Sequence, residues 1–204
     1  MLIKTLPVGM IETNCYIVTD ETTLNCAVID PGDESNTILD YVESNHLKVS
    51  YIFLTHGHFD HTMAATAVYE ETGAKICMHR ADSNATVQDA PYRFNPPEDT
   101  IWYKEGDKFT VGALEFSVLE TPGHTPGGVT LLCEDAMFCG DTLFRDSCGR
   151  TDLPGGSMPQ LLGSLKRLYD LPGDFEVYPG HMDSTTLSRE RRFNYYMKYA
   201  LEQD

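Results

Sequence analysis

Short apolar runs separated by turn-forming residues recur along the whole chain and predict a protein rich in strands. Apolar runs of this length that end at Gly, Pro, Asn or Asp are typical of strands buried on one or both faces. The predicted strands cover residues 2–7, 14–19, 25–30, 49–54, 74–78, 109–111, 114–119, 129–133, 136–139 and 175–178.

Helical spacing of apolar residues appears between these strands. In segment 34–47 the apolar positions are Ile38, Leu39, Val42 and Leu47, which predicts a helix. Further helices are predicted over 61–72, 158–169 and 186–201. Segment 89–99 contains three prolines and no periodicity, so we expect a surface loop there, a candidate border for a site.

The order of the predicted elements indicates the fold class. Strands and helices are interleaved near both ends of the chain, and consecutive strands fill the middle. This order predicts an α/β fold in which helices cover sheets. A length of 204 residues is enough for one domain with a sizeable core, so we expect a single domain over 1–204.

Composition limits the possible partners. The net charge is −16 with only 15 Lys and Arg residues, which argues against a nucleic-acid partner. No apolar stretch is long enough to span a bilayer, and MLIKTLPVGM lacks the features of a secretory signal. We therefore expect a cytoplasmic protein with no membrane partner.

The six cysteines contain no C-x-x-C pair and lie mostly in apolar runs, so reduced, buried thiols are expected.

Candidate metal ligands follow four of the apolar runs. YIFL precedes THGHFDH, FSVL precedes ETPGH, AMFC precedes GD and FEVY precedes PGH. Sites form where strands end and loops begin, because the sheet fixes those positions. Any one of these side chains alone would more often be an ordinary polar group, but five of the seven histidines in the chain fall here. The candidates are His56, His58, Asp60, His61, His124, Asp141 and His181. His46 and His79 lack such neighbours and are expected to be structural.

The spacing of these candidates suggests two ions. In an extended loop, residues two apart point to the same side, so His56 and His58 can bind one ion. Asp60 and His61 follow as the chain turns into a helix and point elsewhere. Adding His124 to the first pair and His181 to the second gives each ion three ligands. A carboxylate with two oxygens can bridge the ions, a role that suits Asp141. Histidine with carboxylate fits Zn, Fe or Mn.

The pattern H-x-H-x-D-H, followed by later His, Asp and His, resembles the metallo-β-lactamase superfamily. The similarity extends from NCYIV (14–18) and IDPGD (29–33) to the terminal helix. It implies an αββα sandwich, with two mixed sheets flanked by helices and a dinuclear site at one edge. It also implies the ligand sets given above: the three histidines 56, 58 and 124, then Asp60, His61 and His181, with Asp141 bridging.

Within that superfamily the chain is most similar to glyoxalase II, in a short form. Asp141 replaces the cysteine ligand of the true β-lactamases, and GDTLFRDSCGRTDLPGG (140–156) resembles the glyoxalase II segment GDTLF…CG[K/R]. The resemblance implies that Arg150 binds the glycine carboxylate of glutathione. The chain departs from glyoxalase II in lacking its C-terminal helical domain. Asp152 and Met182-Asp183 also replace aromatic residues that contact glutathione there. RTDLPGGS and TTLSRERRFN resemble short bacterial relatives, and also persulfide dioxygenases that use one iron.

The expected activity is metal-dependent hydrolysis of a thioester of acylglutathione type, or a related small anionic ester. Two divalent ions, expected to be zinc, with iron or manganese as alternatives, would turn a bridging water into the nucleophile. Asp60 is a candidate for proton handling as well as metal binding. Asp30 is a candidate for orienting a ligand histidine. Two divalent ions, two aspartate ligands and one hydroxide would give the site a net charge near +1. This charge, together with Arg150, suits a small anionic substrate. The alternative is a mononuclear iron dioxygenase acting on glutathione persulfide.

Overall fold

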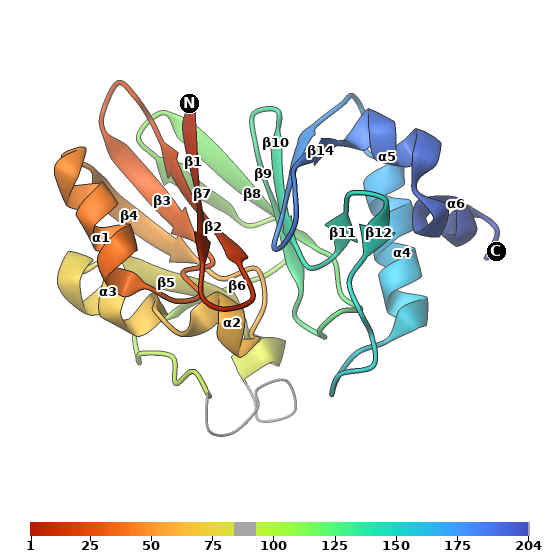
Figure 1. The fold of residues 1–204 in the computed structure, drawn as a ribbon, viewed down its shortest axis with the longest axis horizontal. Coiled ribbons are helices and arrows are strands. Elements are labelled where there is room, and N and C mark those ends of the chain that lie inside the picture. The colour runs from red at the N-terminus through yellow and green to blue at the C-terminus, as the bar shows by residue number, and fades with distance from the viewer. Residues whose placement is uncertain (84–92, 204) are drawn as a thin grey trace.

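Two six-stranded sheets face each other in the computed structural model, which describes residues 1–83 and 93–203 (Figure 1). The first sheet has its strands in chain order. The β1–β2 and β2–β3 pairs are antiparallel, and the remaining pairs are parallel, so the sheet is mixed. Its strands are β1 (Leu2–Val8), β2 (Thr13–Thr19), β3 (Asn25–Ile29), β4 (Lys48–Phe53), β5 (Lys75–His79) and β6 (Ile101–Tyr103).

The second sheet has the order β14-β13-β10-β9-β8-β7 and is also mixed. Strand β9 is antiparallel to both β8 and β10, and β13 is parallel to β10. Strands β8, β10 and β13 therefore run in the same direction, and their carboxyl ends lie at one edge of the sheet. The strands are β7 (Lys108–Val111), β8 (Leu114–Glu120), β9 (Val129–Cys133), β10 (Ala136–Gly140), β13 (Glu176–Pro179) and β14 (Thr185–Thr186). A separate hairpin pairs β11 (Leu143–Phe144) with β12 (Ser147–Cys148).

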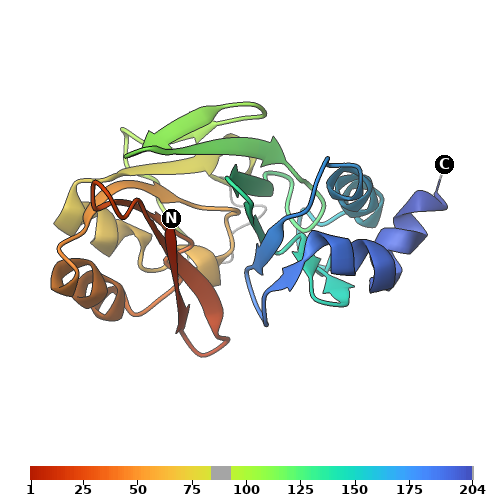
Figure 2. The same ribbon diagram turned by 90° about the horizontal axis from the view of Figure 1, so that it is seen from above.

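Helices cover the outer face of each sheet (Figures 1 and 2). Helices α1 (Ser35–Ser44) and α3 (Ala65–Thr72) cover the first sheet, with α2 (Phe59–Thr62) at its edge. Helices α4 (Met158–Tyr169), α5 (Leu187–Phe193) and α6 (Tyr195–Leu201) cover the second. A short 3₁₀ helix, η1 (Arg80–Ser83), follows β5. The α/β sandwich of two mixed sheets flanked by helices is confirmed.

Three apolar layers hold the sandwich together, and alternation along the strands assigns side chains to them. The first layer packs the outer face of the first sheet on α1 and α3, and the third packs the second sheet on α4 to α6. The middle layer lies between the sheets, where Phe53 meets Phe116 with ring centroids 5.3 Å apart. The central strands β2, β3 and β10 are buried on both faces, and β3 and β10 appear in the sequence as nearly continuous apolar runs.

Two of the four predicted helices are interrupted, so those predictions were wrong in their extent. The helix predicted over 61–72 is split between α2 and α3, because the Ala64 amide donates to the Pro31 carbonyl at 3.0 Å. The helix predicted over 186–201 is split at Asn194, which has extended backbone and caps α6 with its side chain. Strands β6, β11, β12 and β14 were not predicted, because two or three residues show no periodicity.

The other predictions agree with the structure within a few residues at each end. All six cysteines are free, and five of them are buried, as expected. The predicted loop at 89–99 is irregular over residues 93–99, while residues 89–92 lie outside the described part. Within the described residues, no helix has the length and apolar character needed to cross a membrane.

Candidate metal centre

The seven candidate ligands come from five places in the chain that meet at one edge of the sandwich. His56 and His58 lie in the loop after β4, and Asp60 and His61 belong to α2. The remaining three each follow a strand of the second sheet, after β8, β10 and β13, and are His124, Asp141 and His181. The common direction of those three strands explains why residues far apart in the sequence converge here.

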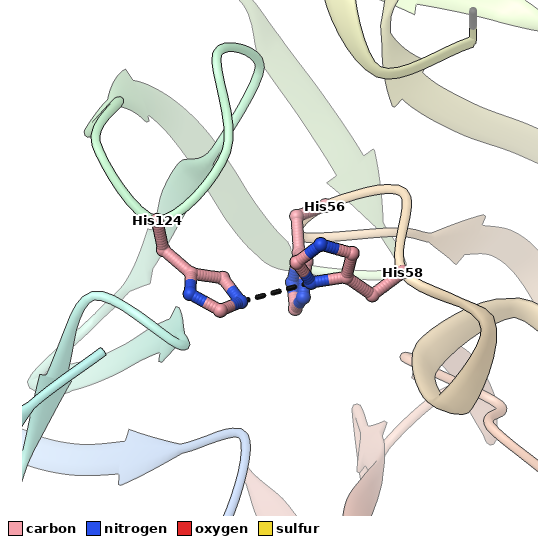
Figure 3. Close-up of side chains that lie close together, drawn as sticks. All are labelled: His56, His58 and His124. Atoms are coloured by element: carbon pink, nitrogen blue, oxygen red, sulfur yellow. Dashed lines mark hydrogen bonds between the residues drawn. The ribbon is translucent and has the colours of Figure 1, made fainter. Parts of the chain in front are cut away.

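The first cluster contains three histidines whose candidate ligand atoms all lie within 4.8 Å of one another. Figure 3 shows His124 reaching from its loop toward His56 and His58, which share the loop after β4. Nδ1 of His58 lies 2.9 Å from Nε2 of His124. His56 and His124 are buried, with 3% and 4% of their surfaces exposed. The spacing therefore brings together three ring nitrogens that could bind one ion.

The second cluster contains Asp60, His61 and His181, again with ligand atoms within 4.8 Å of one another. Oδ2 of Asp60 is 3.4 Å from Nε2 of His61 and 3.2 Å from Nε2 of His181. The hydroxyl of Thr13 also donates to this oxygen, at 3.2 Å. This set contains a carboxylate, so it differs in chemistry from the three histidines of the first cluster.

Asp141 lies between the two clusters. Its Oδ2 is 3.4 Å from Nε2 of His124 in the first cluster and 3.6 Å from Nε2 of His181 in the second. Its Oδ1 is 3.5 Å from Nε2 of His61. One carboxylate thus faces both ligand sets, which is the arrangement that a bridging ligand requires.

Unsatisfied polar atoms indicate that these clusters are built for cations. Among the described residues, four buried side-chain atoms have no hydrogen-bond partner, and three of them are Nε2 of His56, Nε2 of His61 and Oδ1 of Asp141. Buried polar groups are nearly always paired, so such a concentration needs an explanation. All three atoms are metal-ligating types that face neighbouring ligands. The residues therefore fit divalent cations with mixed nitrogen and oxygen ligands.

Hydrogen bonds on the opposite ring nitrogens orient three of the histidines. Nδ1 of His61 lies 2.9 Å from Oδ2 of Asp30. Nδ1 of His124 lies 2.7 Å from the Arg150 carbonyl, and Nδ1 of His181 lies 3.2 Å from the Ile11 carbonyl. In each case Nε2 is left facing the centre. Such bonds fix the tautomer and the ring orientation of metal ligands.

Asp30, proposed from the sequence as an orienting residue, is buried and makes further bonds to the loop after β4. Its Oδ1 accepts the Thr55 amide at 2.7 Å, and its Oδ2 accepts the Thr55 hydroxyl at 2.6 Å. Asp30 lies close enough to His56 and His61 to form a third candidate cluster with them. Because its oxygens already accept these hydrogen bonds, the geometry favours orientation over metal binding.

Burial lowers the pKa of two site histidines, whereas neighbouring carboxylates raise the pKa of a third. Burial, together with His124, lowers the pKa of His58 to about 3, and burial lowers the pKa of His56 well below its usual value. Burial also acts to lower the pKa of His61, but the charge of Asp30 and other nearby carboxylates raises it to about 9. His56 and His58 therefore present neutral imidazoles at pH 7, the form that binds metal.

Asp82 is a buried residue of the site region that sequence reasoning missed. Its Oδ2 accepts the Gly57 amide at 2.9 Å and the Thr125 hydroxyl at 2.7 Å, and its Oδ1 accepts the Gly127 amide at 2.6 Å. One carboxylate thus links the loop of His56 and His58 to the loop of His124. No spacing in the sequence marks it, because its partners are 25 to 45 positions away.

We expect the Asp82→Asn variant to bind metal about tenfold or more weakly than the wild type, because groups that orient metal ligands contribute 10- to 100-fold in affinity. An amide lacks one of the acceptor oxygens that join the two loops. Competition with a coloured chelator measures the affinity. Asp170→Asn, an exposed position after α4, is the matched control. Equal metal affinity in both variants and the wild type would contradict a positioning role.

A cleft of about 650 Å³ opens over the clusters. Its lining includes Arg150, the residue proposed to bind the substrate carboxylate, together with His58, His124, Asp141 and His181. The guanidinium of Arg150 already donates two hydrogen bonds to Asp152, each at 2.7 Å. Both side chains are mostly exposed. A substrate carboxylate would therefore have to compete with Asp152 for this guanidinium.

The fold and the clustered ligands define a class of metalloprotein, and comparison with known proteins identifies the family. Residues 8–181 match the family model described as the metallo-beta-lactamase superfamily. The chain belongs to this superfamily, as its sequence motifs suggested. Members of it bind one divalent metal ion and often two, and most are hydrolases or related enzymes.

Particular relatives include a hydroxyacylglutathione hydrolase, GloC, of Haemophilus influenzae. It is 32% identical over 206 residues, covering 95% of this chain and 97% of that protein. Among solved structures, the BLEG-1 B3 metallo-beta-lactamase has a TM-score of 0.87 at 31% identity, covering 96% and 99% of the two chains. ETHE1 from Myxococcus xanthus has a TM-score of 0.84 at 30% identity, covering 100% and 91%. TTHA1623 in a di-iron-bound form has a TM-score of 0.81 at 35% identity, covering 95% and 99%.

Proposed function

We propose that this protein is a dinuclear metal-dependent hydrolase of glyoxalase II type that cleaves a thioester with a small, anionic thiol carrier. The observation on which the proposal rests is the position of Asp141, within 3.6 Å of a ring nitrogen of each cluster. The similarity to GloC supports a thioester substrate. The similarity to a di-iron protein supports two ions in one site. We propose zinc as the metal, with iron or manganese as alternatives.

The proposed ligands follow the two clusters. His56, His58 and His124 would hold the first ion. Asp60, His61 and His181 would hold the second, and Asp141 would serve as a ligand shared by both. Two divalent ions bound there would lower the pKa of water toward neutrality and polarise the substrate carbonyl. Asp30 and the backbone carbonyls keep the histidine Nε2 atoms directed at the centre.

Asp60 is the residue proposed to handle a proton. Its carboxylate lies beside His181 and lines the cleft, so it faces both the second cluster and the substrate space. Burial acts to raise its pKa, but the hydrogen bond with His181 and the nearby imidazoles lower it overall. The leaving thiolate of a thioester has a conjugate-acid pKa of about 8.5, so the reaction needs no separate general acid.

A second candidate function is oxidation of a persulfide by a mononuclear iron centre. The structural similarity to ETHE1 over the whole chain favours it. A mononuclear enzyme would need only the first cluster, whereas here Asp60, His61 and His181 also converge. Because all three proposed ligands of a second ion are present, the hydrolase is the favoured function.

Side-by-side assays distinguish the two functions. Metal-loaded protein is given S-lactoylglutathione, with thiol release recorded, and separately glutathione persulfide, with oxygen uptake recorded. We expect thiol release without oxygen uptake. Oxygen uptake with no thiol release would contradict the hydrolase and support the dioxygenase.

The close packing of Gly180 against the centre gives a further test. A Cβ at this position would overlap Oδ1 of Asp141 and lie 2.7 Å from Cε1 of His61. We expect Gly180→Ala to lower kcat for thioester hydrolysis about 100-fold, because a displacement near 1 Å has that effect on a catalytic group. Gly163→Ala, in α4 with no heavy atom within 4 Å of the added carbon, is the control and should keep full activity. Equal kcat in both variants would contradict the requirement for space at residue 180.

A further inference from the structure

A second hollow of about 300 Å³ lies beside the metal cleft, between the turn that joins β1 to β2 and the beginning of α2. Figure 1 shows this turn and α2 at the same end of the first sheet. Most of the lining surface is apolar. The lining residues are Val8, Gly9, Met10, Ile11, Gly32, Asp33, Phe59, Asp60 and Met63.

The hollow adjoins the metal cleft and shares part of its wall. Ile11, Phe59 and Asp60 line both spaces. Asp60 belongs to the second cluster and lines both spaces, so the hollow lies next to the metal centre. A part of the substrate that is attached to the reacting carbonyl can therefore extend into it.

The chemistry of the walls suits an uncharged hydrocarbon chain. Met10, Ile11 and Met63 are exposed by 100%, 54% and 47%, which leaves apolar surface that a ligand could cover. Methionine side chains adapt to ligands of varied shape. The charged groups in the lining are the carboxylates of Asp33 and Asp60, which would repel an anionic chain.

The metal cleft away from this hollow has a different character. Arg150 and Ser147 line it there, and the Arg150 side chain is 62% exposed. A polar thiol carrier, larger than the hollow, fits this open side, where its carboxylate would compete with Asp152 for the Arg150 guanidinium. We infer that the hollow is the acyl subsite, which takes an unbranched, uncharged acyl chain while the carrier lies toward Arg150. This inference rests on the proposed thioester hydrolysis and adds the class of acyl group.

The volume of the hollow limits the length of the acyl chain that it can hold. About 300 Å³ corresponds to the share of liquid volume of roughly ten water molecules, enough for a linear chain of about six to eight carbons. Each buried methylene contributes about 0.8 kcal/mol, or roughly fourfold in affinity, when it is fully removed from water. Catalytic efficiency should therefore rise with chain length and then level off.

The test uses metal-loaded protein and thioesters of one thiol, N-acetylcysteamine, with acetyl, butyryl, hexanoyl and octanoyl groups. We expect kcat/KM to rise at least tenfold from acetyl to hexanoyl. In Met63→Glu, which places a charge in the wall, this rise should disappear while acetyl hydrolysis stays near the wild-type value. Met158→Glu, an exposed methionine at the start of α4, is the matched control and should keep the rise.

Equal kcat/KM for all chain lengths in the wild type, or an unchanged rise in Met63→Glu, would overturn the acyl subsite while leaving thioester hydrolysis intact. If no thioester is cleaved, the proposed function fails, and calorimetry with acetate, butyrate, hexanoate and octanoate still tests the hollow. Affinity that increases with chain length in the wild type and not in Met63→Glu would support it. Affinity independent of length would overturn it.

Discussion

Asp141→Ala is expected to hydrolyse thioesters about 100- to 1000-fold more slowly than the wild type, the usual effect of losing a preorganised electrostatic group in an active site. The Asp141 carboxylate faces both clusters, with its oxygens 3.4 Å from Nε2 of His124, 3.5 Å from Nε2 of His61 and 3.6 Å from Nε2 of His181. Without it, two cations would repel each other with no protein carboxylate shared between them. The variant should therefore also retain fewer than two ions per chain.

The matched control for this prediction lies at the other end of the same strand. Asp135 precedes β10 as Asp141 follows it, and its side chain is exposed. Asp135→Ala should keep wild-type kcat and metal content, which steady-state kinetics and elemental analysis measure on the same samples. Wild-type activity in Asp141→Ala, with two ions still bound, would contradict a bridging role.

Removal of metal is expected to lower the melting temperature by about 10 °C or more. A ligand present at 1,000 times its Kd stabilises the native state by about 4 kcal/mol. One kcal/mol corresponds to about 2–4 °C in a chain of 150–250 residues. The metal-free protein also leaves Nε2 of His56, Nε2 of His61 and Oδ1 of Asp141 buried without hydrogen-bond partners. Thermal unfolding with and without a chelator measures the shift.

A variant that cannot bind the metals separates this effect from a direct action of the chelator. In the double variant His56→Ala, His61→Ala, each cluster loses one imidazole, so the chelator should change the melting temperature by about 1 °C or less. An unchanged melting temperature in the wild type after complete metal removal would show that the clusters do not use metal to stabilise the fold.

Much of the centre was predictable because its ligands follow buried strands. The strand before Asp141 is buried on both faces and appears in the sequence as a continuous apolar segment, whereas the strands before His124 and His181 alternate between buried and more exposed residues. Each of the three runs has a recognisable end. Each ligand lies within a few residues of that end. The convergence of the three depends on strand direction, which the sequence does not state and the family resemblance supplied.

Features that depend on contacts between distant segments were not predictable. Asp82 joins two loops through bonds to Gly57 and Gly127, and nothing near it in the sequence distinguishes it from a surface aspartate. The break between α2 and α3 depends on the Pro31 carbonyl, which competes for the Ala64 amide. In each case tertiary structure overrides local propensity.

Anomalous diffraction from crystals of the metal-loaded protein, recorded on both sides of the absorption edge of the bound metal, tests the two-ion centre most directly. We predict two peaks, one among His56, His58 and His124 and the other among Asp60, His61 and His181, with Asp141 between them. A single peak confined to the three histidines, at full metal loading, would contradict the dinuclear hydrolase.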